Sequence, residues 1–160
     1  MKKQKGFSLI ELLIVVAIIL IIAAIAIPNL LRSRMAANEA SAVGSIRTIN
    51  TAQVTYSSTY PATGFAASLA SLGGTASSCT GSATSTNACL LDSVLSLGTK
   101  SGYTFVVGGT SGTPVVTYTV TGAPVVVGQT GQRAFFSDQS GVIRYNANGT
   151  GESVTDPPLQ

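Results

Sequence analysis

The feature that most constrains this 160-residue chain is an apolar stretch near its amino terminus. Every residue from Leu12 to Ile27 is apolar, and Glu11 stands immediately before the stretch. Such a segment is stable only in lipid or in the dry centre of an assembly, and a carboxylate at its start costs about 2.5 to 3.5 kcal/mol on membrane-insertion scales. We therefore expect Glu11 to have a partner, and the remaining residues to form one small domain.

Three interpretations of residues 1–31 are open. A secretory signal would use the basic start and the small-x-small pattern Ala24-Ile25-Ala26. A plain transmembrane anchor needs about 20 apolar residues, slightly more than the stretch supplies by itself. Neither gives Glu11 a role. Cleavage after Gly6 does, because the new ammonium group of Phe7 in one subunit would then pair with Glu11 of another and fix the register of neighbouring helices.

The basic balance of the chain comes from its first six residues. Nine basic and six acidic residues give a net charge of +3. Three of the nine, Lys2, Lys3 and Lys5, precede Phe7, so the 9 − 3 = 6 basic residues that follow equal the six acidic ones. No basic patch with interleaved aromatic residues is left, and we predict no specific nucleic-acid site.

The residue types present argue against catalysis. The chain has no histidine, the commonest general base, and its two cysteines cannot complete a tetrahedral zinc site. Asp138 alone does not make a calcium site. We expect no enzyme, no catalytic residue, no cofactor and no metal. In an exported chain Cys79 and Cys89 are expected to form one local disulfide, whereas in the cytoplasm they would be two free thiols.

The pattern after Pro28 becomes amphipathic. Apolar residues recur at helical intervals as far as Tyr56, which predicts one helix from about Ser8 to Ser57, kinked near Pro28, with residues 42–57 facing a head. Short helical turns are expected at 69–72 and within 90–97.

Strand patterns fill the last third of the chain. Alternating apolar residues predict strands at 103–107 and 116–120, and Pro114 and Pro124 are expected at strand ends. Residues 133–137 and 142–145 predict a hairpin closed by a polar turn at 138–141. The fold class is therefore α+β: a long amino-terminal α-helix, half apolar and half amphipathic, packed on a small antiparallel β-sheet head.

The segment Lys5-Gly6-Phe7-Ser8-Leu9-Ile10-Glu11-Leu12-Leu13 resembles the class III signal sequence of the type IV pilin and type II secretion pseudopilin family. The resemblance implies the pilin fold, cleavage between Gly6 and Phe7, and methylation of the new Phe7 amino group by a prepilin peptidase. It also implies that Glu11 pairs with a neighbour's amino terminus. Pro28 resembles the proline that kinks or loosens the family's helix, and residues 133–146 resemble the family's carboxy-terminal hairpin.

These patterns predict four segments. Residues 1–6 are a cleaved prepilin leader, 7–31 a transmembrane and filament-core helix, 32–57 an amphipathic helix packed on the head, and 58–160 a globular head with a disulfide loop and an antiparallel sheet. The amino terminus is expected in the cytoplasm and the single span in the bacterial inner membrane.

The family implies a structural subunit of a type IV pilus, serving adhesion, motility or DNA uptake. The alternatives are a pseudopilin of a type II secretion system and, from another class, a membrane-anchored extracytoplasmic binding module. The expected partners are further copies of the chain, alone or with minor pilins, the prepilin peptidase, the inner-membrane assembly platform and, before assembly, the cytoplasmic membrane. The final location would be an extracellular pilus or a periplasmic pseudopilus.

Overall fold

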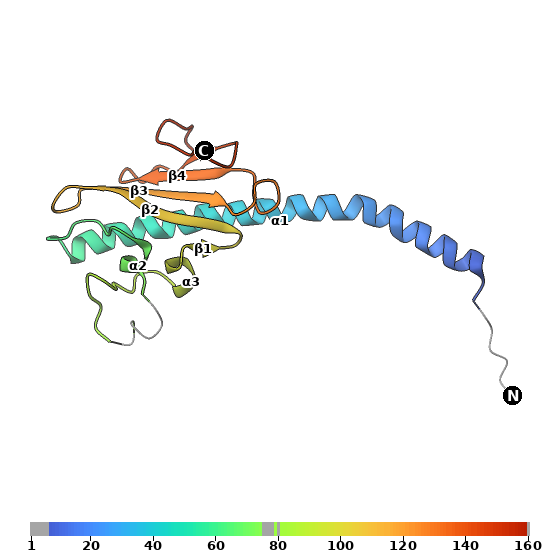
Figure 1. The fold of residues 1–160 in the computed structure, drawn as a ribbon, viewed down its shortest axis with the longest axis horizontal. Coiled ribbons are helices and arrows are strands. Elements are labelled where there is room, and N and C mark those ends of the chain that lie inside the picture. Colours follow the sequence, from blue (N-terminus) through green and yellow to red (C-terminus); the bar gives the residue numbers. More distant parts are fainter. Residues whose placement is uncertain (1–6, 75–78, 80, 160) are drawn as a thin grey trace. The chain divides into compact units, whose positions relative to one another are not determined.

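The computed structural model describes residues 7–74, 79 and 81–159, which form a long helix and an α+β head (Figure 1). The expected leader, with Gly6, lies outside the described residues. The elements are α1 (Leu9–Thr59), α2 (Leu69–Leu72), α3 (Ser93–Ser96), β1 (Thr99–Lys100), β2 (Tyr103–Ser111), β3 (Thr117–Pro124), β4 (Ala134–Asp138) and β5 (Arg144–Asn146). The chain divides within α1 into two units, Met1–Arg34 and Met35–Gln160, and each is considered separately.

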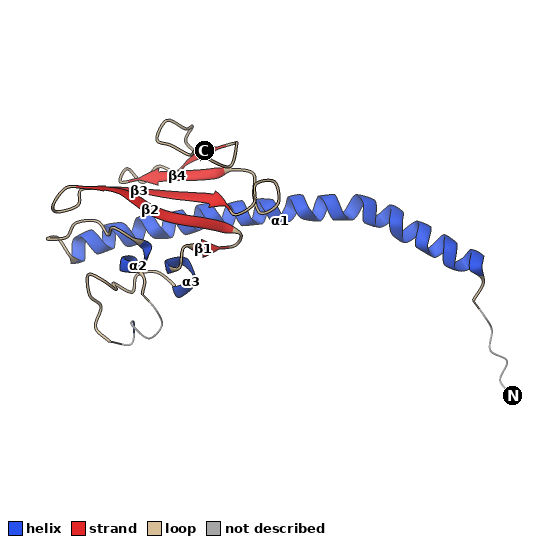
Figure 2. Cartoon of the chain, in the orientation of Figure 1, coloured by secondary structure: helices blue, strands red, loops and turns tan. Residues whose placement is uncertain are grey.

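The head is built on one antiparallel sheet whose strands follow chain order, β1 to β5 (Figure 2). The period of two along the sequence is confirmed: Tyr103, Phe105 and Val107 of β2 are buried, as are Tyr118 and Val120 of β3. These side chains share one face of the sheet, because successive residues of a strand point to opposite sides. The α+β class predicted from the sequence is therefore confirmed.

The strands differ in several details from the sequence prediction, and β2 and β3 extend beyond the predicted 103–107 and 116–120, to Ser111 and Pro124. The pair Thr99–Lys100 forms a short edge strand, β1, that the apolar pattern did not indicate. The last strand begins at Arg144 instead of Val142, where its pairing with β4 starts. The Gly141 N–H donates to the Asp138 carbonyl at 2.9 Å and the Val142 N–H donates to Ser140 Oγ at 3.3 Å, so both groups bond within the connection and not to β4.

The core lies between the sheet and the part of α1 within the head. Ala42, Ile46, Ile49 and Tyr56 of α1 are at most 1 % exposed, which confirms that residues 42–57 face the core. The side chains that meet them include Phe105, Tyr118, Val120 and Phe135. Burying a large apolar side chain completely contributes roughly 1.5 to 3 kcal/mol, so this layer is the main source of stability of the head.

Two amide side chains join α1 to the segments around it, one of them buried and the other half-buried. Gln53 has no exposed surface; its Nε2 donates to the Ala66 carbonyl at 3.0 Å, and its Oε1 accepts from the Ala66 N–H at 2.8 Å. Asn50 donates to Ser137 at 2.8 Å and accepts from the Tyr118 hydroxyl at 3.2 Å. Burial, with a smaller effect of the Asp138 charge, raises the pKa of Tyr118 to about 12, so this hydroxyl remains a donor over the whole useful pH range.

An ion pair fixes the start of β4 against α1. Glu39 Oε1 accepts from the backbone N–H groups of Gln132 at 2.8 Å and Arg133 at 3.1 Å, while Oε2 accepts from the Arg133 guanidinium at 2.8 Å. The guanidinium also stacks on the rings of Phe135 and Tyr145. Burial raises the pKa of Glu39, but the hydrogen bonds from Gln132 and Arg133 and the arginine charge outweigh it, and the net pKa lies below the ordinary value.

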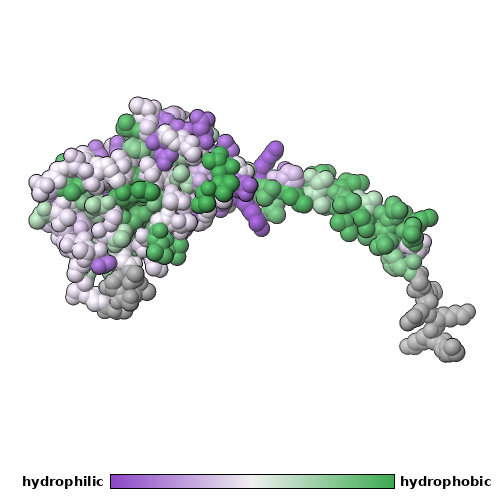
Figure 3. Space-filling view, viewed as in Figure 1, coloured by the Kyte–Doolittle hydropathy of each residue, from purple (hydrophilic) through white to green (hydrophobic). Residues whose placement is uncertain are grey.

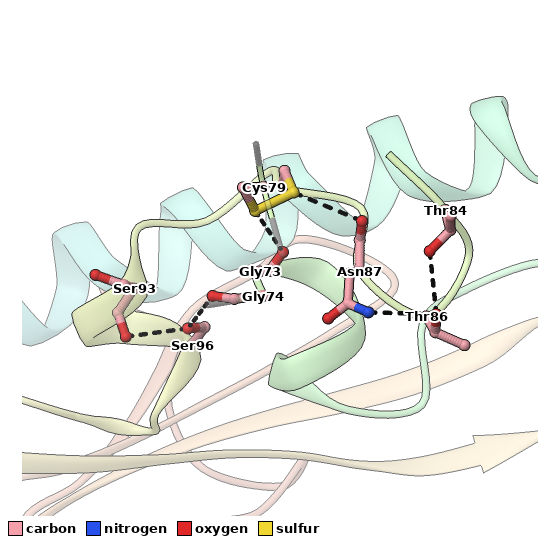
Figure 4. Close-up of a disulfide and its surroundings, with 9 residues drawn as sticks. Gly73, Gly74, Cys79, Thr84, Thr86, Asn87, Ser93 and Ser96 are labelled. Atoms are coloured by element: carbon pink, nitrogen blue, oxygen red, sulfur yellow. Dashed lines mark hydrogen bonds between the residues drawn. A yellow bond between two sulfur atoms is a disulfide. The ribbon is translucent and has the colours of Figure 1, made fainter. Parts of the chain in front are cut away.

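The predicted disulfide between Cys79 and Cys89 is present, with a Cα–Cα distance of 5.8 Å (Figure 4). The Cys89 N–H donates to the Gly73 carbonyl at 2.8 Å, so the bridge joins its loop to the end of α2. Closing a loop with a sequence separation of 10 stabilises the fold by roughly 2 to 3 kcal/mol in the chain-entropy model.

The carboxy-terminal tail covers the outer edge of β5. The Tyr145 N–H donates to the Pro157 carbonyl at 3.1 Å, and the Leu159 N–H donates to the Ile143 carbonyl at 2.8 Å. The two consecutive prolines, Pro157 and Pro158, have no backbone N–H groups that could donate to a further strand on the side of the tail away from β5. The tail therefore pairs with the last strand without presenting a full set of new donors to a further strand.

Candidate functional site

The candidate site is the first part of α1, and it begins with a hydrogen-bonded turn. Ser8 directly precedes the helix, and its backbone N–H donates to Glu11 Oε2 at 2.9 Å. Glu11 is the third helical residue, so this contact is the half of a capping box in which the acidic side chain reaches back to the residue before the helix. A carboxylate in the first turn also interacts favourably with the helix dipole.

The sequence analysis missed this local role of Glu11. The pattern Ser8-Leu9-Ile10-Glu11 has the Ser-x-x-Glu spacing of a capping box, which would have indicated it. The contact places the carboxylate one residue away from Phe7, whose side chain is 76 % exposed. Glu11 is exposed as well, and the structure shows no contact of its second oxygen with the residues that it describes. The carboxylate is thus held near Phe7 and remains accessible to another molecule.

The apolar side chains after Glu11 are exposed in the part of the unit Met1–Arg34 that the structure describes. Every residue from Phe7 to Leu31 is exposed except Ala23, which is half-buried. The large apolar side chains among them are Phe7, Leu9, Ile10, Leu12, Leu13, Ile14, Val15, Val16, Ile18, Ile19, Leu20, Ile21, Ile22, Ile25, Ile27, Leu30 and Leu31. Figure 3 shows them as an almost continuous hydrophobic surface. An exposed apolar surface of this size marks a segment that is covered in its functional state.

The length of the segment suits a lipid bilayer. Among the described helices α1 is the one that is long and apolar enough to cross a membrane, judged by length and composition. At about 1.5 Å per residue, Leu9 to Leu31 extends roughly 34 Å, compared with about 30 Å for a hydrocarbon core.

Pro28 lies inside α1, and the helix continues through it. A proline has no N–H for the carbonyl of the residue four positions earlier, here Ala24, so one hydrogen bond of the helix is missing at this point. That the helix loosens at Pro28 during assembly remains a prediction. The structure brings Glu11 close to Phe7, whereas Pro28 and the disulfide of Cys79 and Cys89 lie in other parts of the chain.

In the part of the chain that the structure describes, no group of three or more histidine, cysteine, aspartate or glutamate residues could hold a metal ion. The chemistry that the candidate site offers is a single carboxylate at the start of an apolar helix.

Residues 1–27 match the family model of the prokaryotic N-terminal methylation motif. This match and the similarity to the two type IV pilins named below agree with the resemblance of the amino-terminal segment to a class III signal sequence. The chain is similar to the type IV wide pilus major component PilA4 of Thermus thermophilus, with 64 % identity over 39 residues, and to the type IV major pilin protein PilA of Myxococcus xanthus, with 45 % identity over 54 residues.

These matches are local. They cover 24 % and 34 % of this chain, and the chain spans 30 % of the Thermus protein and 24 % of the Myxococcus protein. No solved structure matches the chain. The match to the family model covers residues 1–27, which include Phe7 and Glu11, and the head is described by its own structure.

Proposed function

We propose that the chain is a structural, non-enzymatic subunit of a type IV pilus. The observation that carries the proposal is the exposed apolar half of α1 with an accessible carboxylate, Glu11, held beside Phe7 at its start. Lipid covers such a helix in a membrane, and other copies of the same helix cover it in a filament. The two type IV pilins to which the chain is locally similar support the second state.

The proposed mechanism begins with cleavage between Gly6 and Phe7 by a prepilin peptidase, followed by methylation of the new amino group. The new ammonium carries a positive charge into an apolar setting, where it needs an anionic partner. Glu11 of a neighbouring subunit supplies that partner. The charge pair forms in one axial register only, so it sets the spacing between subunits while the apolar contacts supply most of the binding energy.

The same proposal assigns a place to each segment: leader 1–6, span and filament core 7–31, amphipathic helix 32–57 and head 58–160. Before assembly the chain crosses the cytoplasmic membrane once with its amino terminus in the cytoplasm, and afterwards it lies in an extracellular filament. Its partners are further copies, minor pilins and the assembly platform. The filament serves adhesion, motility or DNA uptake.

The proposal is tested with two variants of Glu11 in the natural host of the chain. Glu11→Gln keeps an oxygen that can accept from Ser8 but removes the charge, whereas Glu11→Ala removes both. We expect intact mass and amino-terminal sequencing to show cleavage after Gly6 in both variants. We expect filaments sheared from the cells to fall by more than tenfold in both, since each 1.4 kcal/mol of lost association energy is a factor of ten.

Glu152→Gln serves as the control, because it removes one carboxylate of the head and leaves the start of α1 unchanged. Normal filament yield from Glu11→Gln would refute the charge pairing, and a mature protein that begins elsewhere than Phe7 would refute the filament proposal altogether. Imaging of the sheared material separates a long pilus from the short filament of a secretion system.

A further inference from the structure

Asn148 is the one asparagine of the chain that is followed by a glycine. The pair Asn148-Gly149 lies in the turn after β5, and the Asn148 side chain is exposed. The residue after an asparagine decides how easily its backbone nitrogen reaches the side-chain amide, and glycine has no Cβ to block the approach. Among the asparagines of the chain, Asn148 is therefore the one best placed to react with the backbone.

The packing of the turn requires this glycine. Gly149 has a φ of +76°, and a Cβ at its position would lie 2.8 Å from the Gln132 carbonyl oxygen and 2.8 Å from Val127 Cγ2. Both distances are shorter than van der Waals contact, and a positive φ disfavours any residue that has a Cβ. The residue that leaves the Asn148 amide open to attack is thus fixed by the fold.

The two asparagines of the turn differ in how they are held. The Asn146 side chain is half-buried; its Nδ2 donates to Asp156 Oδ1 at 3.3 Å, and its Oδ1 accepts from the Asn148 N–H at 2.9 Å. The described residues make no hydrogen bond with the Asn148 side-chain amide. The Gly149 N–H donates to the Asn146 carbonyl at 3.4 Å, longer than the roughly 3.2 Å that bounds most such bonds. The two groups that would react are therefore weakly held.

We propose that Asn148 is a site of spontaneous deamidation in the folded chain. The backbone nitrogen of Gly149 attacks Cγ of Asn148 and closes a cyclic imide. The bond between Cγ and Nδ2 breaks, and the amide nitrogen leaves as ammonia with the proton that the Gly149 nitrogen gives up. Water then opens the imide at one of its two carbonyl groups, so residue 148 becomes aspartate or isoaspartate.

The reaction changes the charge and the backbone of the turn. Aspartate has an ordinary pKa of about 3.9, so the product carries a negative charge at neutral pH. Basic and acidic side chains balance in the chain that follows the leader, and each conversion therefore leaves one negative charge in excess. Isoaspartate also routes the backbone through the side-chain carbon, which should disturb the hydrogen bonds to Asn146. In a filament, a consequence that rests on the proposed function, the charge would accumulate as each copy ages.

The reaction is followed in the full-length chain, folded in detergent micelles and incubated near neutral pH in water enriched in heavy oxygen. Trypsin, used in ordinary water, then cleaves after Arg144. The peptide that begins at Tyr145 contains both asparagines of the turn, so Asn146, which precedes Ala147, is an internal control. Tandem mass spectrometry locates the conversion and separates isoaspartate from aspartate. The oxygen label shows that water entered during the incubation and not during digestion.

We expect Asn148 to convert at least about tenfold faster than Asn146, since Ala147 has the Cβ that Gly149 lacks. The rate should rise with pH, because the Gly149 nitrogen must lose its proton. Isoaspartate should be among the products, because direct hydrolysis of the amide gives aspartate alone. Asn148→Gln, which keeps an amide on a longer side chain, should stay unconverted over the same period.

Three results would overturn the proposal. Conversion of Asn148 in the chain unfolded by urea, but not in the folded chain, would mean that the turn protects the amide. Equal rates at Asn146 and Asn148 would remove the role of the glycine. Labelled aspartate without isoaspartate would show that water attacks the amide directly.

Discussion

Neutralising Glu39 should lower the stability of the head by a measurable amount that depends on pH. In Glu39→Gln the oxygen that accepts from the backbone of Gln132 and Arg133 is kept. The second oxygen, which accepts from the Arg133 guanidinium, becomes an amide NH₂ group facing a donor. A hydrogen bond to a charged group contributes about 1.5 to 3 kcal/mol.

Solvent screens part of this contribution. The Glu39 side chain is 12 % exposed, but that of Arg133 is 39 % exposed. We therefore expect a loss of about 1 to 2 kcal/mol at pH 7, and a melting temperature lower by roughly 4 to 8 °C for a head of this size. Lys100→Gln is the matched control, because it breaks the ion pair between Lys100 and Asp92. The side chains of Lys100 and Asp92 are 36 % and 49 % exposed, so the loss should be less than about 0.5 kcal/mol.

The pH dependence follows from the lowered pKa of Glu39. A carboxyl group whose folded-state pKa lies below the unfolded value, here 4.5, contributes its stability fully above that value. The contribution is lost as the pH falls through the lower folded-state pKa. The difference between the native chain and Glu39→Gln should therefore shrink from pH 7 to pH 3, as measured by thermal circular dichroism of the full chain in detergent. An equal difference at both pH values, or none at pH 7, would refute this account of the ion pair.

Two further predictions concern buried backbone groups and are checked by the same unfolding measurement. Gln53→Leu leaves the N–H and carbonyl of Ala66 without their partners and should cost about 2 to 5 kcal/mol; a loss below 1 kcal/mol would mean that water replaces the amide. Gly64→Ala would place a Cβ 2.1 Å from the Val115 carbonyl oxygen at a φ of +79°. It should destabilise the head much more than Gly141→Ala. Gly141 has a φ of +73° but no atom near its added Cβ, so its replacement should cost about 1 to 2 kcal/mol. Equal losses of stability would show that the positive φ, and not the close contact with Val115, sets the cost at both positions.

The sequence predicted the helices and strands in which apolar residues recur at a regular spacing. The long helix was placed to within two residues at each end, because apolar residues are uniform before Pro28 and recur at helical intervals after it. The strands around Tyr103 and Tyr118 alternate in burial as expected. A two-residue strand such as Thr99–Lys100 has no period, and only its pairing with Tyr103 and Thr104 defines it.

Contacts between distant residues were beyond the reach of such patterns. Glu39 and Arg133 are 94 positions apart, and nothing in the spacing of charges indicates that they meet. Gln53 lies on the buried side of α1, and a buried amide is costly unless it is hydrogen-bonded. Its partner, the backbone of Ala66, is not indicated by any pattern in the sequence. At the candidate site the sequence predicted that the Glu11 carboxylate needs a partner. The hydrogen bond from the Ser8 backbone N–H to Glu11 was found in the structure.

The tail that covers β5 has a consequence for how heads meet one another. With Pro157 and Pro158 lying along the outer edge of β5, two heads brought side by side there would have few backbone groups with which to join their sheets. Contacts between heads at this edge would be made by side chains. Surface residues there can then vary, and change what the exterior of an assembly presents, without altering the hydrogen bonding that holds each head together.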